Sequence, residues 1–425
     1  MNGRSGAGAG PGVSVAPDAE GSPAVSPSLT RLRERREAAV GRRRRRRRLG
    51  VLFVLVILVS PAVYSYTTTM LQPSSLPLGV RSVEWLRNHH GNWLVDEVEN
   101  IYYSWKAPKK GGPQLKSLPA AGLKPTATVS RRVRRAGRTR ARSETWPPRI
   151  KPVFANPLPG EGVWERTGSL VDGGPPVLVT TFRTELDYPR IVAYVAWFDH
   201  RRAALAFYPG RYEPPNAPVR GPMSVPSSQR WRLLATFNGG FTYIDGHNGS
   251  AVNGLTNEPL KVGLATLIGY RDGRVDIKIW SGGPNAPRNV AFARQSLPPI
   301  VWNGHLNPAL NDSTQWGFTL GNAVRVWRTG VGIDRRGNLI YAAANDQTVT
   351  TLAQVLRRAG AVKAMQFDIN PEWPTLITYS HHHGLDPNKV VPNVMQPATR
   401  YLVPDDRDFF AVYRRLPGPV TVPFK

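Results

Sequence analysis

The sequence predicts an α+β fold, a mixed β-sheet domain with few helices, preceded by a single N-terminal transmembrane helix and a basic linker. Gly and Pro each occur 40 times in the 425 residues, which is typical of strands joined by turns rather than of long helices. From about residue 152, short apolar runs alternate with turn residues, as in β-rich domains. Hydrophobic residues make up 41% of the chain, enough for a packed core, and cysteine is absent. The absence of cysteine excludes disulfides, thiolate metal sites and a cysteine nucleophile.

The first 48 residues are predicted to form a disordered, basic cytoplasmic tail. They contain twelve arginines and four acidic residues, and the first thirty are rich in Gly, Ala, Ser and Pro without an apolar pattern. Seven consecutive arginines end this tail at Arg48, and an uncharged apolar run follows at 49–66. Eighteen helical residues span about 27 Å, close to the thickness of a bilayer core. We therefore expect a transmembrane helix at 49–66.

The arginine block also predicts the orientation of this helix. Arginine-rich flanks stay on the cytoplasmic side, so we expect a single-pass protein of the plasma membrane with its C-terminal domain outside the cytoplasm. A cleaved signal peptide is the alternative, with Ser60 and Ala62 as the small residues before the cut. A basic region of 48 residues is long for such a peptide, which favours the anchor.

Two further segments precede the folded domain. Residues 67–105 are predicted to form an amphipathic juxtamembrane segment, with one or two helices interrupted at Gly91. Residues 106–151 carry fourteen basic residues and one acidic residue without apolar periodicity, which predicts a flexible linker. Aromatic residues do not alternate with its arginines, as single-stranded nucleic acid would require. Because most of the net charge of +27 lies in this linker and the tail, we expect no nucleic-acid partner.

The C-terminal domain, residues 152–425, is expected to consist largely of strands. The first four predicted strands are apolar runs, and they lie at 176–182, 190–198, 203–208 and 231–237. The last predicted pair of strands lies at 400–403 and 409–413.

Two hairpins and one helix are predicted in the middle of this domain. The first hairpin joins 265–270 to 274–280 through Asp272-Gly273, and the second joins 330–334 to 339–344. A helix follows, for which Thr348 or Thr350 is the N-cap and Gly360 is the end. The apolar run at 361–367 predicts a buried strand, with Asp368 at its end.

Three segments of the domain carry side chains suited to chemistry. The turn Asn238-Gly239-Gly240-Phe241 allows close approach of a ligand to the backbone, and its Asn amide both donates and accepts. Arg328 can bind a phosphate or carboxylate with its planar fork. The loop FDINPEW at 367–373 brings two carboxylates together in sequence, a pattern suited to acid–base catalysis. Taken singly, a tight turn or a loop whose Asp accepts backbone N–H groups explains the residues equally well.

In their order and spacing, these segments resemble the phosphodiester glycosidase family. That family has an Asn-Gly-Gly-(Phe/Tyr) turn, an Arg-Thr-Ala-(Ile/Val)-Gly strand leading to Asp-x-x-Gly, and a strand ending in Leu-Asp-Gly-Gly-Gly-Ser. The first pattern matches at 238–241 and the second at 328–337, with Gly330 in place of Ala, whereas the third keeps only Asp368. The resemblance covers about residues 175–415 and implies hydrolysis of sugar-1-phosphodiester linkages.

The resemblance also implies roles for individual residues. Asp368 and Glu372 would transfer protons and stabilise the sugar cation. The residues expected to contact the phosphate or the sugar are Asn238, Gly239, Gly240, Arg328, Asn370 and Trp373. No cofactor or metal ion is expected. His381-His382-His383 suggests a metal-binding tract, but neighbouring residues of a strand face opposite sides.

The predicted function is that of a membrane-anchored, extracytoplasmic hydrolase that acts on anionic or phosphorylated glycans of the cell envelope. The alternative is a non-catalytic glycan-binding or envelope-scaffolding domain of the same fold. It arises because Ile369, Asn370 and Pro371 replace the family's glycine triplet, which restricts the backbone and removes one N–H donor. No feature of the sequence indicates an oligomeric state.

Overall fold

The computed structural model describes residues 27–74, 76–91, 93–95, 97–98, 108–121, 146–312, 315–317 and 325–416. The chain divides into two compact units, Met1–Thr68 and Thr69–Lys425. The disorder predicted for residues 1–26 and the flexibility predicted for 122–145 concern residues outside the described ranges.

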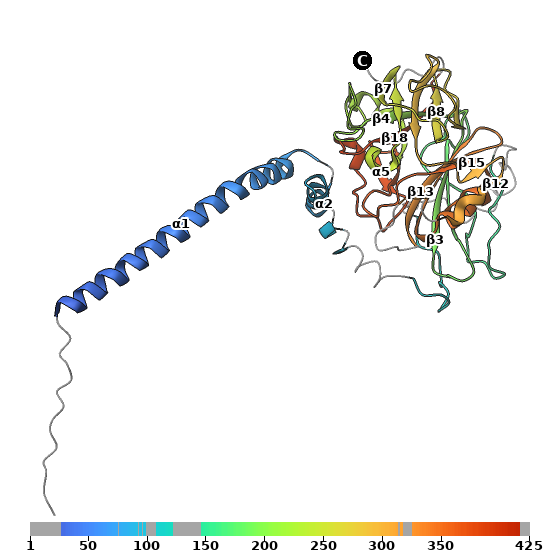
Figure 1. Ribbon diagram of the computed structural model, residues 1–425. Helices are drawn as coiled ribbons and strands as arrows, with labels where there is room; N and C mark the ends of the chain where they lie inside the picture. The colour runs from blue at the N-terminus through green and yellow to red at the C-terminus, as the bar shows by residue number, and fades with distance from the viewer. Residues whose placement is uncertain are drawn as a thin grey trace, which may run out of the picture. The chain divides into compact units, whose positions relative to one another are not determined.

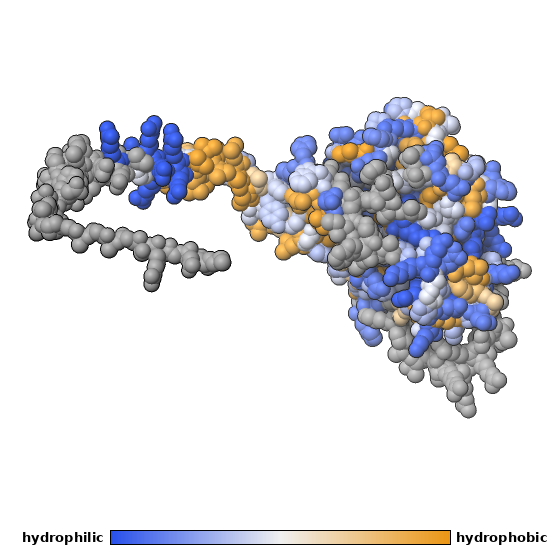
Figure 2. All heavy atoms as spheres, turned by 60° about the horizontal axis from the view of Figure 1, so that its bottom comes forward, coloured by the Kyte–Doolittle hydropathy of each residue, from blue (hydrophilic) through white to orange (hydrophobic). Residues whose placement is uncertain are grey.

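The first unit consists of most of the long helix α1 (Pro27–Leu71). Its part Arg43–Leu71 contains an apolar stretch long enough to cross a membrane. Figure 2 shows the blue arginines at the start of this part and an orange apolar band directly after them. The helix begins at Pro27, so residues 27–48, which we predicted to be part of a disordered tail, are helical. Arginine has a high helix propensity, and the arginine block therefore continues the apolar helix.

Three antiparallel sheets form most of the second unit (Figure 1). The largest has eight strands in the order β1-β2-β3-β14-β13-β15-β11-β12. These strands are β1 (Glu165–Arg166), β2 (Val177–Arg183), β3 (Val192–Phe198), β11 (Val301–Trp302), β12 (His305–Leu306), β13 (Val326–Asp334), β14 (Leu339–Gln347) and β15 (Ala361–Gln366).

The other two sheets have five strands each. One has the order β17-β16-β5-β18-β4 and the other the order β7-β6-β10-β8-β9. The first contains β4 (Ala203–Tyr208), β5 (Leu233–Asn238), β16 (Leu376–Ser380), β17 (Asp386–Lys389) and β18 (Phe409–Arg414). The second contains β6 (Ser250–Val252), β7 (Leu255–Glu258), β8 (Ala265–Tyr270), β9 (Val275–Ile279) and β10 (Val290–Gln295). Short helices, α5 (Tyr243–Gly246), η1 (Ser227–Arg232) and η2 (Pro308–Asn311), lie in the connections.

The main core lies between these sheets. Each sheet contributes a large side chain to it, for example Tyr341 from β14, Phe410 from β18 and Phe292 from β10. On the other face of the large sheet, α6 (Val349–Arg358) buries Leu352, Val355 and Leu356. The chain leaves this doubly covered sheet at the end of β15, two residues before Asp368.

Most of the predicted elements are confirmed. The four early strands correspond to β2, β3, β4 and β5, and both predicted hairpins form, as β8–β9 and β13–β14. Helix α6 has Thr348 as its N-cap, in a reciprocal capping box with Thr351.

The strand predicted at 400–403 is wrong. Residues Arg400–Leu402 form the 3₁₀ helix η5. The Arg400 side chain is buried, pairs with Asp405 at 2.8 Å and donates to the Trp373 carbonyl oxygen at 3.0 Å. Side-chain bonds rather than a strand ladder therefore fix this segment.

Part of the predicted linker contacts the folded domain. Arg183 Nη1 donates to Gln114 Oε1 at 3.2 Å, and Leu115 and Leu118 pack against the main core. Trp146 and Ile150 pack on the α6 side of the large sheet. Residues that pack on the folded domain therefore begin before residue 152, where we predicted the domain to start.

Candidate functional site

The candidate site is centred on Asp368, which follows β15. Its Oδ2 accepts a hydrogen bond from Arg407 Nη2 at 2.7 Å, and its Oδ1 accepts one from the Asn370 N–H at 2.9 Å. Burial raises the pKa of Asp368, while the Arg407 guanidinium and the Asn370 N–H oppose the rise. The carboxylate is thus held in one position by a cation and a backbone donor.

Asn238, at the end of β5, is tied to Asp368 through Thr329. Asn238 Nδ2 donates to Thr329 Oγ1 at 3.1 Å, and Thr329 Oγ1 donates to the Asp368 carbonyl oxygen at 2.8 Å. Asn238 Oδ1 accepts from Tyr341 Oη at 2.6 Å and from the Thr375 N–H at 3.2 Å. The Asn amide therefore links the end of β5 to β13, to β14 and to the residue before β16, and its contact with a sugar stays a prediction.

The two glycines after Asn238 allow close packing against a second ion pair. A Cβ atom on Gly239 would lie 2.1 Å from Asp408 Oδ1, and one on Gly240 would lie 3.5 Å from the Arg294 guanidinium. Arg294 Nε pairs with Asp408 Oδ2 at 2.5 Å. Any side chain at position 239 would displace Asp408, so this glycine is required for the arrangement.

Glu213 lies beside this second ion pair. Tyr243 Oη donates to Asp408 Oδ2 at 2.9 Å, and the Tyr243 N–H donates to Glu213 Oε2 at 3.1 Å. Burial raises the pKa of Glu213 to about 7, and the nearby Arg407 is the main opposing charge. The site thus contains carboxyl groups with different surroundings, which is typical of acid–base sites.

Sequence reasoning missed four of these residues: Glu213, Arg294, Arg407 and Asp408. One signal was present, since Asp405-Asp406-Arg407-Asp408 places four charged residues immediately before the apolar strand β18. Arg294 lies inside an apolar run, VAFARQ, and a charged residue in a buried strand requires a partner.

Arg328 occupies a different environment from Asp368. Its Nε donates to the Gln347 carbonyl oxygen at 3.0 Å, and its Nη1 donates to Gln366 Oε1 at 2.9 Å. Within the described part of the chain, its hydrogen bonds go to uncharged oxygen atoms, and burial lowers its pKa to about 10. Its neighbour Thr329 contacts Asn238 instead, because successive residues of a strand face opposite sides. Phosphate binding by Arg328 stays a prediction.

The loop after Asp368 is a pair of turns closed by side chains. The Glu372 N–H donates to Asn370 Oδ1 at 3.0 Å, and Gln396 Nε2 donates to the Glu372 carbonyl oxygen at 2.8 Å. The Trp373 ring lies under two guanidinium groups, with the Arg407 and Arg400 carbons 4.7 Å and 5.1 Å from its centroid.

The juxtamembrane segment covers this loop. Leu76 and Val80 pack on Trp373, and Val80 belongs to helix α2 (Leu78–Asn88). Arg87 Nη1 lies 3.8 Å from Glu372 Oε2, and Ser74 Oγ donates to Asp406 Oδ2 at 3.2 Å. Asp368, Glu372, Trp373 and Arg407 are only 5%, 6%, 1% and 7% exposed. Of the predicted site residues, Asn238, Gly239, Gly240, Asp368, Asn370, Glu372 and Trp373 are linked by the contacts above.

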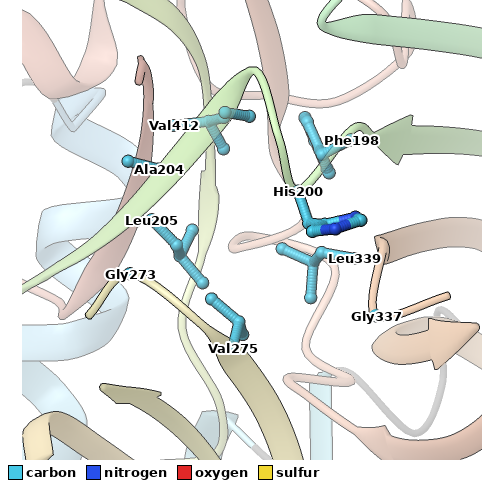
Figure 3. A pocket seen from close by; sticks show the side chains of 10 residues that line it. Phe198, His200, Ala204, Leu205, Gly273, Val275, Gly337, Leu339 and Val412 are labelled. Atoms are coloured by element: carbon cyan, nitrogen blue, oxygen red, sulfur yellow. The ribbon is translucent and has the colours of Figure 1, made fainter. Parts of the chain in front are cut away.

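A small pocket elsewhere contains none of the predicted site residues. It lies at the ends of strands and turns of the main core, where His200 and apolar side chains such as Phe198 and Leu339 line it (Figure 3). Its volume of about 20 Å³ suffices for roughly one water molecule. Within the described ranges, no three His, Asp or Glu side chains gather as metal ligands.

Comparison with known proteins locates the family resemblance. Residues 232–368 match the model of the phosphodiester glycosidase family, which confirms the resemblance over the stretch from β5 to Asp368. A solved structure of the zebrafish N-acetylglucosamine-1-phosphodiester alpha-N-acetylglucosaminidase catalytic domain, auto-inhibited by its pro-peptide, is 14% identical. The match covers 59% of this chain and 87% of that one, with a TM-score of 0.40. A hypothetical protein from Synechocystis is 11% identical over 57% of this chain and 63% of its own, with a TM-score of 0.33. A search of curated proteins found no match.

Proposed function

We propose that this chain, which carries a phosphodiester glycosidase domain, is a membrane-anchored, extracytoplasmic hydrolase of sugar-1-phosphodiester linkages in cell-envelope glycopolymers. The observation that carries the proposal is the position of Asp368. It ends the family match at 232–368 and is held by Arg407 in a buried cluster of carboxylates and arginines. Charged groups with perturbed pKa values, gathered in one place, are typical of catalytic sites.

The proposed reaction breaks the bond between the sugar C1 atom and the bridging oxygen of the phosphodiester. Positive charge develops on the sugar in such a transition state, and the Asp368 carboxylate is suited to stabilise it. Arg407 and Arg294 supply positive charge for the phosphate. Glu372, four residues after Asp368, is the second carboxylate proposed from the sequence.

Substrate access requires the covering segment to move. Trp373 and Asp368 are buried beneath residues around Leu76 and Val80, so a glycan reaches Asp368 only when α2 is displaced. Closing segments that exclude water until a substrate is bound are common in enzymes.

A hydrolysis assay of the full chain in detergent tests this function. Wild type is expected to release free sugar from N-acetylglucosamine 1-(methyl phosphate) or from a related sugar-1-phosphodiester. Asp368→Asn should lower the rate by about 10²- to 10⁴-fold, the usual effect of losing such a group. Glu165→Gln, which changes an exposed carboxylate on β1, is the matched control and should behave as wild type.

The alternative function, a non-catalytic glycan-binding or scaffolding domain, is favoured by one observation. Ile369 packs with Phe241 and Val326 in an apolar cluster beside Asp368, where the family pattern has glycine. If wild type releases no sugar and Asp368→Asn changes only glycan affinity or stability, the enzyme proposal is wrong and the binding function stands.

A further inference from the structure

The charges around Asp368 do not balance. Arg407 pairs with Asp368 and Arg294 pairs with Asp408. Glu213 is a third carboxyl group beside these two pairs, and the hydrogen bond that its side chain makes among the described residues comes from a neutral backbone N–H. Glu213 is also half-buried, whereas the other four residues are buried. Among the described residues, Glu213 is therefore the carboxyl group of this set that forms no ion pair with an arginine, and it is the most exposed of the five residues.

The backbone fixes Glu213 next to Arg407. The Glu213 N–H donates to the Asp406 carbonyl oxygen at 3.2 Å, and the Gly210 N–H donates to the Glu213 carbonyl oxygen at 2.7 Å. A Cβ atom on Gly210 would lie 2.4 Å from the Arg407 carbonyl carbon, so the two segments run in direct contact. The segment that contains Arg407, the ion-pair partner of Asp368, thus also fixes the position of Glu213.

The Arg407 guanidinium has one hydrogen-bond donor, Nε, without a partner among the described residues. Its Nη2 binds Asp368, but its buried Nε has no hydrogen-bond partner among the described residues. A buried donor without a partner costs about 1–3 kcal/mol, which a ligand oxygen can recover. A phosphate oxygen that accepts from Nε would lie beside the guanidinium that binds Asp368 and interacts with Glu213.

We propose that Glu213 is the proton donor for the bridging oxygen of a phosphodiester held by Arg407; this step rests on the function proposed above. The bond between C1 and the bridging oxygen breaks with its electron pair on oxygen, and the Glu213 proton moves to that oxygen. Asp368 stays ionised and stabilises the positive charge at C1. Water then adds to C1 and returns a proton to Glu213, so the enzyme is restored and the products are the free sugar and a phosphate monoester.

The surroundings of Glu213 suit this role. Desolvation and the Asp408 charge raise its pKa, while Arg407, Arg294 and the Tyr243 N–H lower it, with a result of about 7. A carboxyl group with this pKa is protonated in a useful fraction near neutral pH and ionises readily, as an acid–base catalyst must.

The test compares Glu213→Gln with wild type in the full chain, on two substrates. With N-acetylglucosamine 1-(methyl phosphate), we expect the variant to lose about 10²- to 10⁴-fold in rate. With N-acetylglucosaminyl fluoride, whose fluoride leaves without a proton, the variant should retain most of the wild-type rate. The wild-type rate on the phosphodiester should fall as the pH rises through about 7, and this fall should be absent in the variant.

The fluoride substrate also serves as the folding control. Retained fluoride hydrolysis shows that Glu213→Gln is folded, and Glu213→Asp gives a second variant that keeps a carboxyl group and should recover part of the phosphodiester rate. If Glu213→Gln hydrolyses the phosphodiester at the wild-type rate with the wild-type pH profile, Glu213 is not the proton donor, although the proposed function stands. If Glu213→Gln loses activity equally on both substrates, the role of Glu213 is structural. If wild type hydrolyses neither substrate, the proposed function fails and this step fails with it.

Discussion

At the scale of single residues, the buried charges decide how the site responds to pH. The pKa of Glu213 is raised from its ordinary value of 4.5 to about 7 in the folded protein. A carboxyl group with a raised folded pKa binds its proton more tightly when folded, so its stabilising effect is complete below about pH 4.5 and is lost as the pH rises through about 7.

This linkage predicts the stability of a glutamine variant. Glu213→Gln keeps the shape of the side chain without the charge. The melting temperature of the variant minus that of wild type should therefore be larger at pH 8 than at pH 5. Thermal melts of both proteins at the two pH values, with Glu165→Gln as control, give the result. An unchanged difference across this range would mean that Glu213 is ionised throughout.

At the scale of secondary-structure elements, α2 packs on the loop after Asp368, and we propose that it controls access to this residue. Val80 is 4% exposed and packs on Trp373, whereas Leu78 on the same helix is 64% exposed. Val80→Asp would bury a charge against an indole ring, which is strongly unfavourable, so the covering segment should detach. We expect faster hydrolysis and a red-shifted tryptophan emission.

Leu78→Asp is the matched control, because it introduces the same charge into the same helix at an exposed position. It should leave both the rate and the emission unchanged. Equal behaviour of the two variants would indicate that α2 does not close the site.

Elements with strong local signals could be predicted from the sequence, and those fixed by distant side chains could not. Helix α6 has a capping threonine and an apolar stripe, and the β8–β9 hairpin has Asp272-Gly273, so local chemistry was sufficient. The segment at 400–402 was predicted to be a strand, but it forms a 3₁₀ helix. The buried Arg400 side chain makes an ion pair with Asp405 and a hydrogen bond to the Trp373 carbonyl oxygen there. Asp405 is only five residues away, but Trp373 is 27 residues away, and nothing near Arg400 in the sequence marks that second partner.

In the candidate site too, some residues could be predicted from local sequence patterns and others could not. Asp368 and Asn238 were found because each ends an apolar strand in a family pattern. Arg407 and Glu213 were missed because they are separated from Asp368 by 39 and 155 positions in the sequence, and only the packing of β18 against β5 brings Arg407 to the end of β15. The four charged residues at 405–408 mark a special place in the sequence, but nothing local shows that Arg407 pairs with Asp368.

At the scale of the whole molecule, the distribution of arginine makes the topology testable. Twelve arginines precede the apolar part of α1, and the range 106–151 contains fourteen lysines and arginines, so trypsin can cut on both sides of the candidate span. The positive-inside rule places the first group in the cytoplasm, and the second group is then accessible from outside. Trypsin added to intact cells should cleave within 106–151 and leave an N-terminal tag attached to α1, whereas permeabilised cells should lose the tag as well. Loss of the tag from intact cells, with 106–151 protected, would reverse the orientation and place Asp368 in the cytoplasm, where envelope glycopolymers are not its substrate.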